Sequence, residues 1–371
     1  TVKCTLVDNL PDIHTESDQP VDLPAFLLDK WEKEGRKAQE LKELDQFFDS
    51  TGYPRAARFY IIKWLVDYIR ELGIDGFRVD TAKHTEAGVW SELYAEAVKA
   101  FEAWKKENPD KKLDDNNFYM VGEVYNYSIY NGLEYPYEGD TAVNFFAQGF
   151  KSLINFSLKW EAEKKPMDEI FSTYASILNG GDLKGKTVLH YLSSHDDHDP
   201  FDKNREKPFA TANYLMLAPG TPQIYYGDET ARLLHAEGAK GDANLRTFMN
   251  WEELEGNIER NGHRIDEIRN HWARLGLFRR DHPAVGAGKH EKINEEPYTF
   301  KRTYQQDGYS DAVVVVMGNA RESALSGAFE EGTLVTNYYT GEQAEVKEGK
   351  VSFDEPSRLL LIGVKPKDLA N

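Results

Sequence analysis

Residues 54–80 read PRAARFYIIKWLVDYIRELGIDGFRVD, and this stretch decides the fold class. Apolar residues recur at helical spacing in its first part, which predicts an amphipathic helix over 54–72. Pro54 suits the first turn of such a helix, and Gly73 suits its end. The residues that follow, 74–80, predict a short buried strand. A helix that leads directly into a buried strand is typical of α/β folds.

The same alternation continues along the chain. Residues 86–107 repeat the helical pattern, and residues 118–123 form another short apolar run. Further strands are predicted at 142–145, 187–193 and 222–226, and amphipathic segments near 148–178, 204–217 and 264–280. Because these strands are apolar on both faces and alternate with helices, the sequence predicts a parallel sheet covered by helices.

The character of the sequence changes toward both ends. After His282 and Pro283, glycine-punctuated runs such as AVVVVMG (312–318) and SRLLLIGV (357–364) predict a separate all-β domain. Near the other end, residues 22–48 predict a charged amphipathic helical region preceded by a loop. More than one domain is therefore expected, as the length of 371 residues allows.

Composition excludes several classes of partner. The formal net charge of −18 argues against nucleic acid or an anionic membrane, because both favour an excess of Lys and Arg. No run approaches the roughly 18 apolar residues that span a bilayer. The first residues lack the basic start and long apolar stretch of a signal peptide. The single cysteine, Cys4, excludes an intrachain disulfide framework and indicates no thiol metal cluster.

Polar residues gather where the predicted strands end. Arg78 and Asp80 end the first strand, Glu123 ends the second, and His195 and Asp196 follow the strand at 187. In a parallel β/α protein these ends form one face, which is where barrel enzymes have their active sites. A carboxylate beside a guanidinium favours its ionised form, and one in drier surroundings can keep a proton. Such a pair indicates glycoside hydrolysis, although a buried ion pair and a helix-start glutamate are ordinary structural alternatives.

The stretch 191–200, YLSSHDDHDP, carries five consecutive ionisable side chains before a proline. Its density of His and Asp is compatible with a metal site, with a catalytic carboxylate and its helpers, or with a solvated loop. The residues alone leave these three interpretations open.

Several motifs together resemble one family. GIDGFRVDTAKH (73–84), GEVYN (122–126) and YLSSHD (191–196) resemble, in order and spacing, three signature regions of the α-amylase family of retaining glycoside hydrolases. LPDI (10–13) looks like its fourth marker, near the end of the domain inserted after the third barrel strand, and APGTPQIYYGDE (218–229) looks like its eighth-strand region. Within the family, the chain looks most similar to bacterial secreted or periplasmic α-amylases.

The resemblance implies a (β/α)8 TIM barrel, of which this chain supplies about the last five β/α units, followed by a C-terminal antiparallel β-sandwich. It assigns 1–50 to the end of the inserted domain B and a connecting helix, 51–283 to the catalytic barrel, and 284–371 to the all-β domain. An open five-stranded sheet would leave two unpaired edges and an exposed apolar interior. We therefore expect a complementary N-terminal segment that completes the barrel.

The resemblance also implies roles for single residues. Asp80 resembles the catalytic nucleophile, Glu123 the general acid/base, and Asp196 the carboxylate that binds sugar hydroxyls and stabilises the transition state. Arg78 looks like the arginine that holds the nucleophile, and His195 like the histidine that binds the sugar at the cleavage point. These roles favour sugar contact over metal binding for the 191–196 motif.

Other positions are implied to bind sugar or metal. Lys83 and His84 match positions that bind glucose units on the leaving-group side, and Tyr125 could stack on a sugar face or serve as packing. The main-chain carbonyl of His84 and the carboxylate of Asp12 resemble two ligands of the family's structural calcium, a hard cation that prefers oxygen. Ser194 replaces the family's usual Asn.

The remaining polar residues near these motifs have no assigned role. Residues 197–199 are interpreted as a polar loop at the rim of the cleft, with substrate contact left open. His190, His263 and His271 are interpreted as structural.

The implied function is an α-amylase that cuts α-1,4-glucosidic bonds of starch, glycogen or maltodextrins internally by double displacement, and its expected location is extracellular or periplasmic. Two alternatives stay open: a transglycosidase or α-glucosidase of the same family, and a non-catalytic family member that binds carbohydrate or a partner. A third, an unrelated barrel with a catalytic metal at His195 and Asp199, would depend on that metal.

Overall fold

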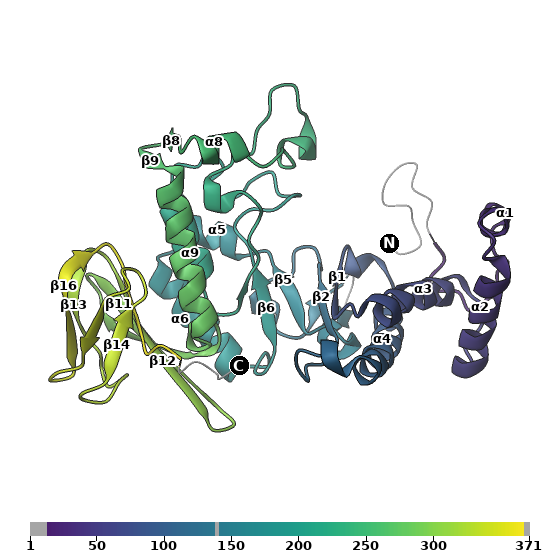
Figure 1. Ribbon diagram of the computed structural model, residues 1–371, viewed down its shortest axis with the longest axis horizontal. Helices are drawn as coiled ribbons and strands as arrows, with labels where there is room; N and C mark the ends of the chain where they lie inside the picture. Colours follow the sequence, from purple (N-terminus) through teal and green to yellow (C-terminus); the bar gives the residue numbers. More distant parts are fainter. Residues whose placement is uncertain (1–12, 138–140, 367–371) are drawn as a thin grey trace. The chain divides into compact units, whose positions relative to one another are not determined.

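The computed structural model describes residues 13–137 and 141–366. They form two compact units, one of residues up to 125 with 133–153, the other of residues 126–132 with 154 onward. Figure 1 colours the chain along its sequence. None of the described helices is both long and apolar enough to cross a membrane. Cys4 and Asp12 lie outside the described residues.

The first unit combines helices with the start of a parallel sheet. Its described helices are α1 (Ala25–Lys33), α2 (Lys37–Thr51), α3 (Ala57–Leu72) and α4 (Ala87–Glu107), with 3-10 turns η1 (Ala82–His84), η2 (Pro109–Lys111) and η4 (Phe145–Gln148). Its described strands are β1 (Gly76–Val79), β2 (Tyr119–Gly122), β3 (Tyr135–Pro136), β4 (Ala142–Val143) and the start of β5 (Ser152–Asn155). β1 pairs parallel with β2, and β2 pairs parallel with β5, which confirms the predicted parallel strands.

Helix α3 confirms the helix predicted over 54–72, with a later start. It begins only after Ala56, whose backbone is extended, so Pro54 precedes the helix and does not occupy its first turn. The helix ends at Gly73, which has a left-handed φ of 70°. A Cβ at this position would lie 2.3 Å from the ring of Trp104 on α4, so glycine permits both the turn and the close packing of the two helices.

The charged region 22–48 forms two helices, α1 and α2, with Gly35 at a left-handed φ of 71° between them. A buried ammonium then attaches α2 to α3. Lys63 of α3 is buried and pairs with Glu43 of α2 (3.1 Å) and with Asp67 of its own helix (2.6 Å). A charge taken out of water needs such partners, so these carboxylates are required to keep Lys63 inside.

The second unit contains further parallel strands, more helices and a C-terminal β region. Its described helical elements before that region are η3 (Ile129–Asn131), α5 (Leu158–Lys164), α6 (Met167–Gly180), α7 (Pro208–Met216), η5 (Asp228–Thr230), η6 (Gly241–Asn244), α8 (Trp251–Glu255), α9 (Ile265–Asp281) and α10 (Ala284–Ala287). Its strands there are β6 (Thr187–His190), β7 (Thr221–Pro222), β8 (Glu259–Arg260) and β9 (His263–Arg264). β6 pairs parallel with β7, and β8 pairs antiparallel with β9.

The structure corrects the prediction for residues 142–178. Residues 142–145, predicted as one strand, form the two-residue β4 and the start of η4. Residues 148–178, predicted as helical, contain the parallel strand β5 before α5 and α6 begin. β5 has the sequence SLIN and is buried along its whole length. Periodicity does not separate so short a buried strand from a helical segment, which is why the prediction was wrong.

The C-terminal part confirms the predicted antiparallel β domain, drawn in yellow in Figure 1. Its strands are β10 (Lys289–Asn294), β11 (Tyr298–Gln306), β12 (Tyr309–Met317), β13 (Ala320–Ala324), β14 (Leu334–Asn337), β15 (Gln343–Glu345), β16 (Lys350–Ser357) and β17 (Leu360–Gly363). One sheet has the order β10–β11–β12–β17–β14–β15, and β13 pairs with β16. Val314, Leu360 and Phe353 of the two sheets belong to one hydrophobic core, as in a sandwich.

Two guanidinium groups, one from helix α9 and one from this β region, bind the carbonyl end of α7. Arg279 of α9 donates to the carbonyls of Met216 (2.8 Å) and Ala218 (3.0 Å), and Arg302 of β11 donates to that of Leu217 (2.6 Å). These carbonyls lie at the end of α7, where a helix leaves backbone acceptors without helical partners. Burial lowers the pKa of Arg302 to about 9 and that of Arg279 to about 10, so both remain charged at neutral pH.

Of the three histidines interpreted as structural, His190 and His271 are buried and His263 is half-buried. His190, at the end of β6, is fully buried and lies 3.0 Å (Nδ1) from the Asn155 amide nitrogen and 2.7 Å (Nε2) from the Pro219 carbonyl. Gly220 follows with a φ of 102°, and a Cβ there would lie 2.5 Å from His190 Nε2. His271 is buried as well.

Replacing Gly220 by Ala is expected to destabilise the second unit, because the methyl group would collide with a buried imidazole. We expect Gly220→Ala to lower the free energy of unfolding by about 1–3 kcal/mol more than Gly185→Ala, measured by urea denaturation. Gly185 is a matched control, since its φ is 77° but a Cβ there meets open space. Equal losses in both variants would contradict this account of the turn.

Stability is also expected to fall on acidification. Burial lowers the pKa of His190 to about 3, of His271 to about 4 and of His290 to about 3. Because these histidines titrate near about 6.5 in the unfolded chain, the unfolded state binds protons that the folded state does not, and stability declines as pH falls below that value. Each of these three histidines should contribute roughly 2 kcal/mol less to the free energy of unfolding at about pH 5 than at neutral pH.

Urea unfolding at the two pH values tests this with His271→Gln, in which the loss on acidification should be smaller than in the wild type. The exposed His235 provides the control variant His235→Gln, whose loss should match the wild type. An unchanged pH dependence in His271→Gln would show that this histidine is not held neutral.

Candidate active site

Two carboxylates follow neighbouring parallel strands in the first unit. The register of β1 and β2 pairs Val79 with Gly122, so Asp80 and Glu123 are the first residues beyond the two strands. The pairing continues past the strands, because the Glu123 amide donates to the Val79 carbonyl at 2.8 Å. Both side chains meet Arg78, which hydrogen-bonds Asp80 and lies 3.8 Å (Nη2 to Oε2) from Glu123. The structure thus brings together three of the predicted site residues.

The two carboxylates have different surroundings. The side chain of Asp80 is 61% exposed, whereas that of Glu123 is only 12% exposed. One oxygen of Glu123 accepts a hydrogen bond from the Thr81 amide at 2.8 Å. Thr81 has a left-handed φ of 46°, a strained conformation for a β-branched residue. Strain of this kind persists where the surrounding structure holds it, often at functional sites.

The turn η1 after β1 places a cation beside an exposed ring. Lys83 Nζ lies 4.9 Å from the centre of the Tyr125 ring, and the Tyr125 carbonyl accepts the Tyr135 hydroxyl at 2.8 Å. His84 differs, because its Nδ1 is buried without a hydrogen-bond partner in the described part of the chain. Burial, followed by the charge of Lys83, lowers the pKa of His84. Lys83 and the exposed ring of Tyr125 therefore contact each other, and His84 is half-buried.

In the second unit, His195 and Asp196 lie in the loop after β6. His195 Nε2 is 3.4 Å from Asp196 Oδ2, and the hydroxyl of Ser194 accepts the Asp196 amide at 3.3 Å. Arg246 contacts both residues: Nη2 donates to Asp196 Oδ1 at 2.6 Å, and Nε donates to the His195 carbonyl at 3.1 Å. Sequence reasoning missed Arg246, because it lies 50 positions from Asp196 and in none of the recognised motifs.

A buried carboxylate holds the start of this loop. The side chain of Asp228 has no exposed surface, and the Ser193 hydroxyl donates to it at 2.6 Å (Oγ to Oδ1). Arg205 Nη2 lies 2.8 Å from the same oxygen, in an ion pair without the alignment of a hydrogen bond. Asp228 belongs to the recognised 218–229 motif, but the sequence did not show that it holds this loop. That role is visible only because Asp228 is buried against Ser193 and Arg205.

Residues 197–199 are not one uniform polar loop. Asp197 is largely buried and forms an ion pair with Lys159, so it anchors the loop. His198 is exposed and lies 2.7 Å (Nε2 to Oδ1) from Asp242, and Asp199 is exposed. The prediction of a rim loop therefore fits the last two residues better than the first.

The predicted calcium site lies partly outside the described residues. Of its two predicted ligands, only His84 is described, and it offers a single carbonyl oxygen. Among residues 13–137 and 141–366, no three His, Cys, Asp or Glu side chains gather to hold a metal ion. A catalytic metal at His195 and Asp199 therefore has no support in this part of the chain.

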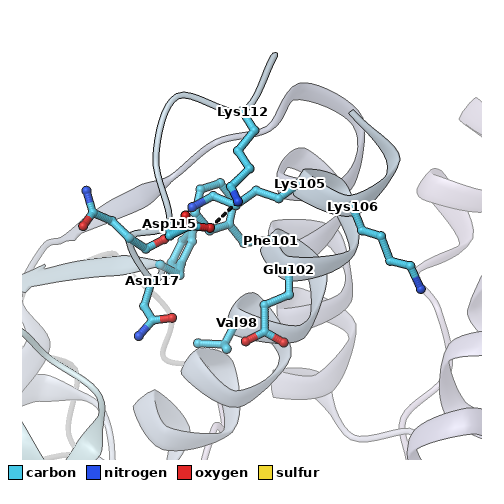
Figure 2. A pocket seen from close by; sticks show the side chains of 10 residues that line it. Val98, Phe101, Glu102, Lys105, Lys106, Lys112, Asp115 and Asn117 are labelled. Atoms are coloured by element: carbon cyan, nitrogen blue, oxygen red, sulfur yellow. Dashed lines mark hydrogen bonds and ion pairs between the residues drawn. The ribbon is translucent and has the colours of Figure 1, made fainter. Parts of the chain in front are cut away.

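A hollow of about 360 Å³ lies elsewhere in the first unit, between α4 and residues 112–118 (Figure 2). Two of its three lysines are engaged: Lys105 donates to two loop carbonyls at 3.0 and 2.6 Å, and Lys112 pairs with Asp115. The hollow adjoins the start of β2, whereas Glu123 follows the end of that strand. Because parallel barrel enzymes have their active sites at the carboxyl ends of the strands, this hollow is not the candidate active site.

Comparisons with known proteins agree with this geometry. A family model described as "Alpha amylase, catalytic domain" matches residues 51–275. The periplasmic alpha-amylase of Escherichia coli (strain K12) is 35% identical over 301 residues, which cover 80% of this chain and 39% of that protein. A cyclomaltodextrinase of a Bacillus species is 26% identical, over 70% of this chain and 41% of that protein. The chain thus spans about two fifths of the length of these relatives.

Among solved structures, AmyP in complex with maltose superimposes with a TM-score of 0.55 at 18% identity, over 86% of this chain and 69% of that one. This likeness concerns the fold. It confirms the predicted class, a (β/α)8 barrel followed by a C-terminal β domain, of which the described residues hold the parallel strands β1, β2, β5, β6 and β7.

Asp228→Asn is expected to destabilise the loop that carries His195 and Asp196. The change would leave the buried Arg205 guanidinium without a counter-charge, which should cost about 3–5 kcal/mol of unfolding free energy in urea denaturation. The exposed Asp182 supplies the control, Asp182→Asn, for which a change within about 0.5 kcal/mol is expected. A small effect of Asp228→Asn would mean that Arg205 finds another partner or water.

Proposed function

Because the chain belongs to the α-amylase family, we propose that it is a retaining endo-α-amylase that cuts internal α-1,4-glucosidic bonds of starch, glycogen or maltodextrins. The main support is the contact of both Asp80 and Glu123 with Arg78 at the ends of β1 and β2. Retaining hydrolysis needs two carboxyl groups close together in different surroundings. The name of the Escherichia coli relative supports the choice of substrate class.

Each of the two carboxyl groups has one part in the proposed reaction. Glu123 donates a proton to the glycosidic oxygen while Asp80 attacks the anomeric carbon, so the leaving sugar departs as an alcohol and a β-linked glycosyl-enzyme forms. Glu123 then takes a proton from water, which displaces Asp80 and releases an α-configured product. Arg78 orients Asp80 through a hydrogen bond to its carboxylate. The Thr81 amide orients Glu123 by donating a hydrogen bond to Oε2 of its carboxyl group.

Further residues are assigned to sugar contact in this proposal. Lys83 and Tyr125 offer an ammonium and an exposed ring, groups that hydrogen-bond and stack on glucose units. His195 and Asp196 carry partly exposed polar groups suited to sugar hydroxyls, with Asp196 also stabilising positive charge in the transition state. His84 is kept as a substrate-binding residue only through its resemblance to the family position.

The alternative within the family is a transglycosidase or α-glucosidase. The cyclomaltodextrinase among the relatives supports keeping it, because the same carboxyl groups serve each of these reactions. The product profile separates them: short oligosaccharides from internal cuts, glucose alone, or rings and lengthened chains.

Other parts of the proposal rest on the relatives. Extracellular or periplasmic location is proposed from the 35% identity with a periplasmic protein. The division into 1–50, 51–283 and 284–371 is kept as the proposed domain organisation. A complementary N-terminal segment is proposed to complete the barrel, because this fold has eight parallel strands. A structural calcium ion at Asp12 and His84 stays a prediction, which calcium titration of chelator-treated protein would test.

Asp80→Asn and Glu123→Gln are expected to abolish most hydrolysis of an end-blocked maltoheptaoside followed by proton NMR. Loss of the acid/base should lower the rate about 10²–10⁴-fold, and the first products of the wild type should be α-anomers. Glu107→Gln and Asp110→Asn, at exposed positions of the same unit, are controls that should retain full activity. Initial β-anomers would exclude retention, and unchanged activity in either site variant would exclude its assigned role.

A further inference from the structure

We infer that Arg246 is a positioning residue that fixes the carboxylate of Asp196 in one orientation. This inference rests on the proposed function, in which Asp196 acts on the sugar. Arg246 itself is not assigned any contact with substrate. Its guanidinium donates to Asp196 Oδ1 at 2.6 Å and to the His195 carbonyl at 3.1 Å, so it binds the side chain and the backbone of the same loop at once.

The backbone around Asp196 is held without Arg246. On one side, Ser193 is bound to the buried Asp228. On the other side, Asp197 is paired with the buried Lys159. The loop is therefore anchored before and after Asp196 by groups inside the protein, and loss of Arg246 should leave the path of the chain unchanged.

The side chain of Asp196, in contrast, is exposed and depends on surface contacts. It is 49% exposed, and it contacts the guanidinium of Arg246 and, at 3.4 Å, the ring of His195. A short side chain in water can change its rotamer at little cost unless a directional contact holds it. The planar guanidinium supplies such a contact, because its two donors point in fixed directions.

Arg246 is itself well placed to act as a fixed point. The carbonyl of Leu245, the preceding residue, accepts the Tyr225 hydroxyl at 2.7 Å, and the carbonyl of Thr247, the following residue, accepts the Tyr226 hydroxyl at 2.6 Å. Both neighbours are thus tied to the segment after β7. The orientation of Arg246 is further supported by Asp242, 3.9 Å away.

The energetics separate this role from a structural one. Arg246 and Asp196 are about equally exposed, and exposed ion pairs contribute little to stability. Removing Arg246 should therefore leave the protein folded and change mainly how Asp196 presents its oxygens. Misplacement of a reacting group by about 1 Å can lower a rate on the order of 100-fold.

A double-mutant cycle with Asp196→Asn tests the inference. We expect Arg246→Gln to lower kcat/KM on a maltooligosaccharide about 10–100-fold in the wild type and less than about 2-fold in the Asp196→Asn background. Arg246→Lys should recover only part of the activity, because an ammonium lacks the planar pair of donors. Arg280→Gln is the matched control, since Arg280 forms an exposed ion pair with Asp281 and should be replaceable without effect.

Equal losses in both backgrounds, or a rise in KM with kcat unchanged, would overturn the inference and indicate that Arg246 acts on substrate directly. A wild type that stays inactive with the complementary N-terminal segment present would instead refute the proposed function. In that case, crystal structures of the wild type and of Arg246→Gln test the positioning role of Arg246 without an activity measurement. A second rotamer of Asp196 in the variant would support the role, and an unchanged carboxylate would exclude it.

Discussion

The candidate site depends on the parallel pairing of β1 and β2. With Val79 opposite Gly122, the two strands end at the same level, and the next residue of each is a carboxylate. The hydrogen bond from the Glu123 amide to the Val79 carbonyl extends this pairing past the strand ends. A shift of β2 by one residue would turn Glu123 to the opposite face of the sheet and separate it from Arg78, which stays beside Asp80 on its own strand. The pairing of the two backbones therefore determines the relative positions of the two candidate catalytic carboxylates.

The second unit uses a different arrangement, in which buried anchors support exposed functional groups. Asp228 and Lys159 are withdrawn from water and bind Ser193 and Asp197, while Asp196 between them stays accessible. Buried charge pairs are costly to break, so they fix the loop more firmly than surface contacts do. The C-terminal β region belongs to this support, because its Arg302 binds the carbonyl end of α7. The β region is thus part of the folded core of the unit that carries the loop.

Local signals predicted the elements that have strong periodicity or a clear end. Helix α3 was predicted with its end at Gly73, because its apolar stripe is long and its stop is a glycine. Strand β5 was missed, since four buried residues contain too little pattern to separate a strand from a helix. The start of α3 was placed too early, because proline is compatible both with a first turn and with the extended residues before it.

The sequence by itself determined the fold class, the family and the candidate carboxylates Asp80, Glu123 and Asp196, because periodicity and short motifs are properties of neighbouring residues. Only the tertiary structure decided which residues distant in the sequence support these carboxylates and their loops. Arg246 reaches Asp196 across 50 positions, and Asp228 reaches Ser193 across 35. Such contacts arise when separate loops converge after strand pairing, and no local pattern of residues encodes that convergence.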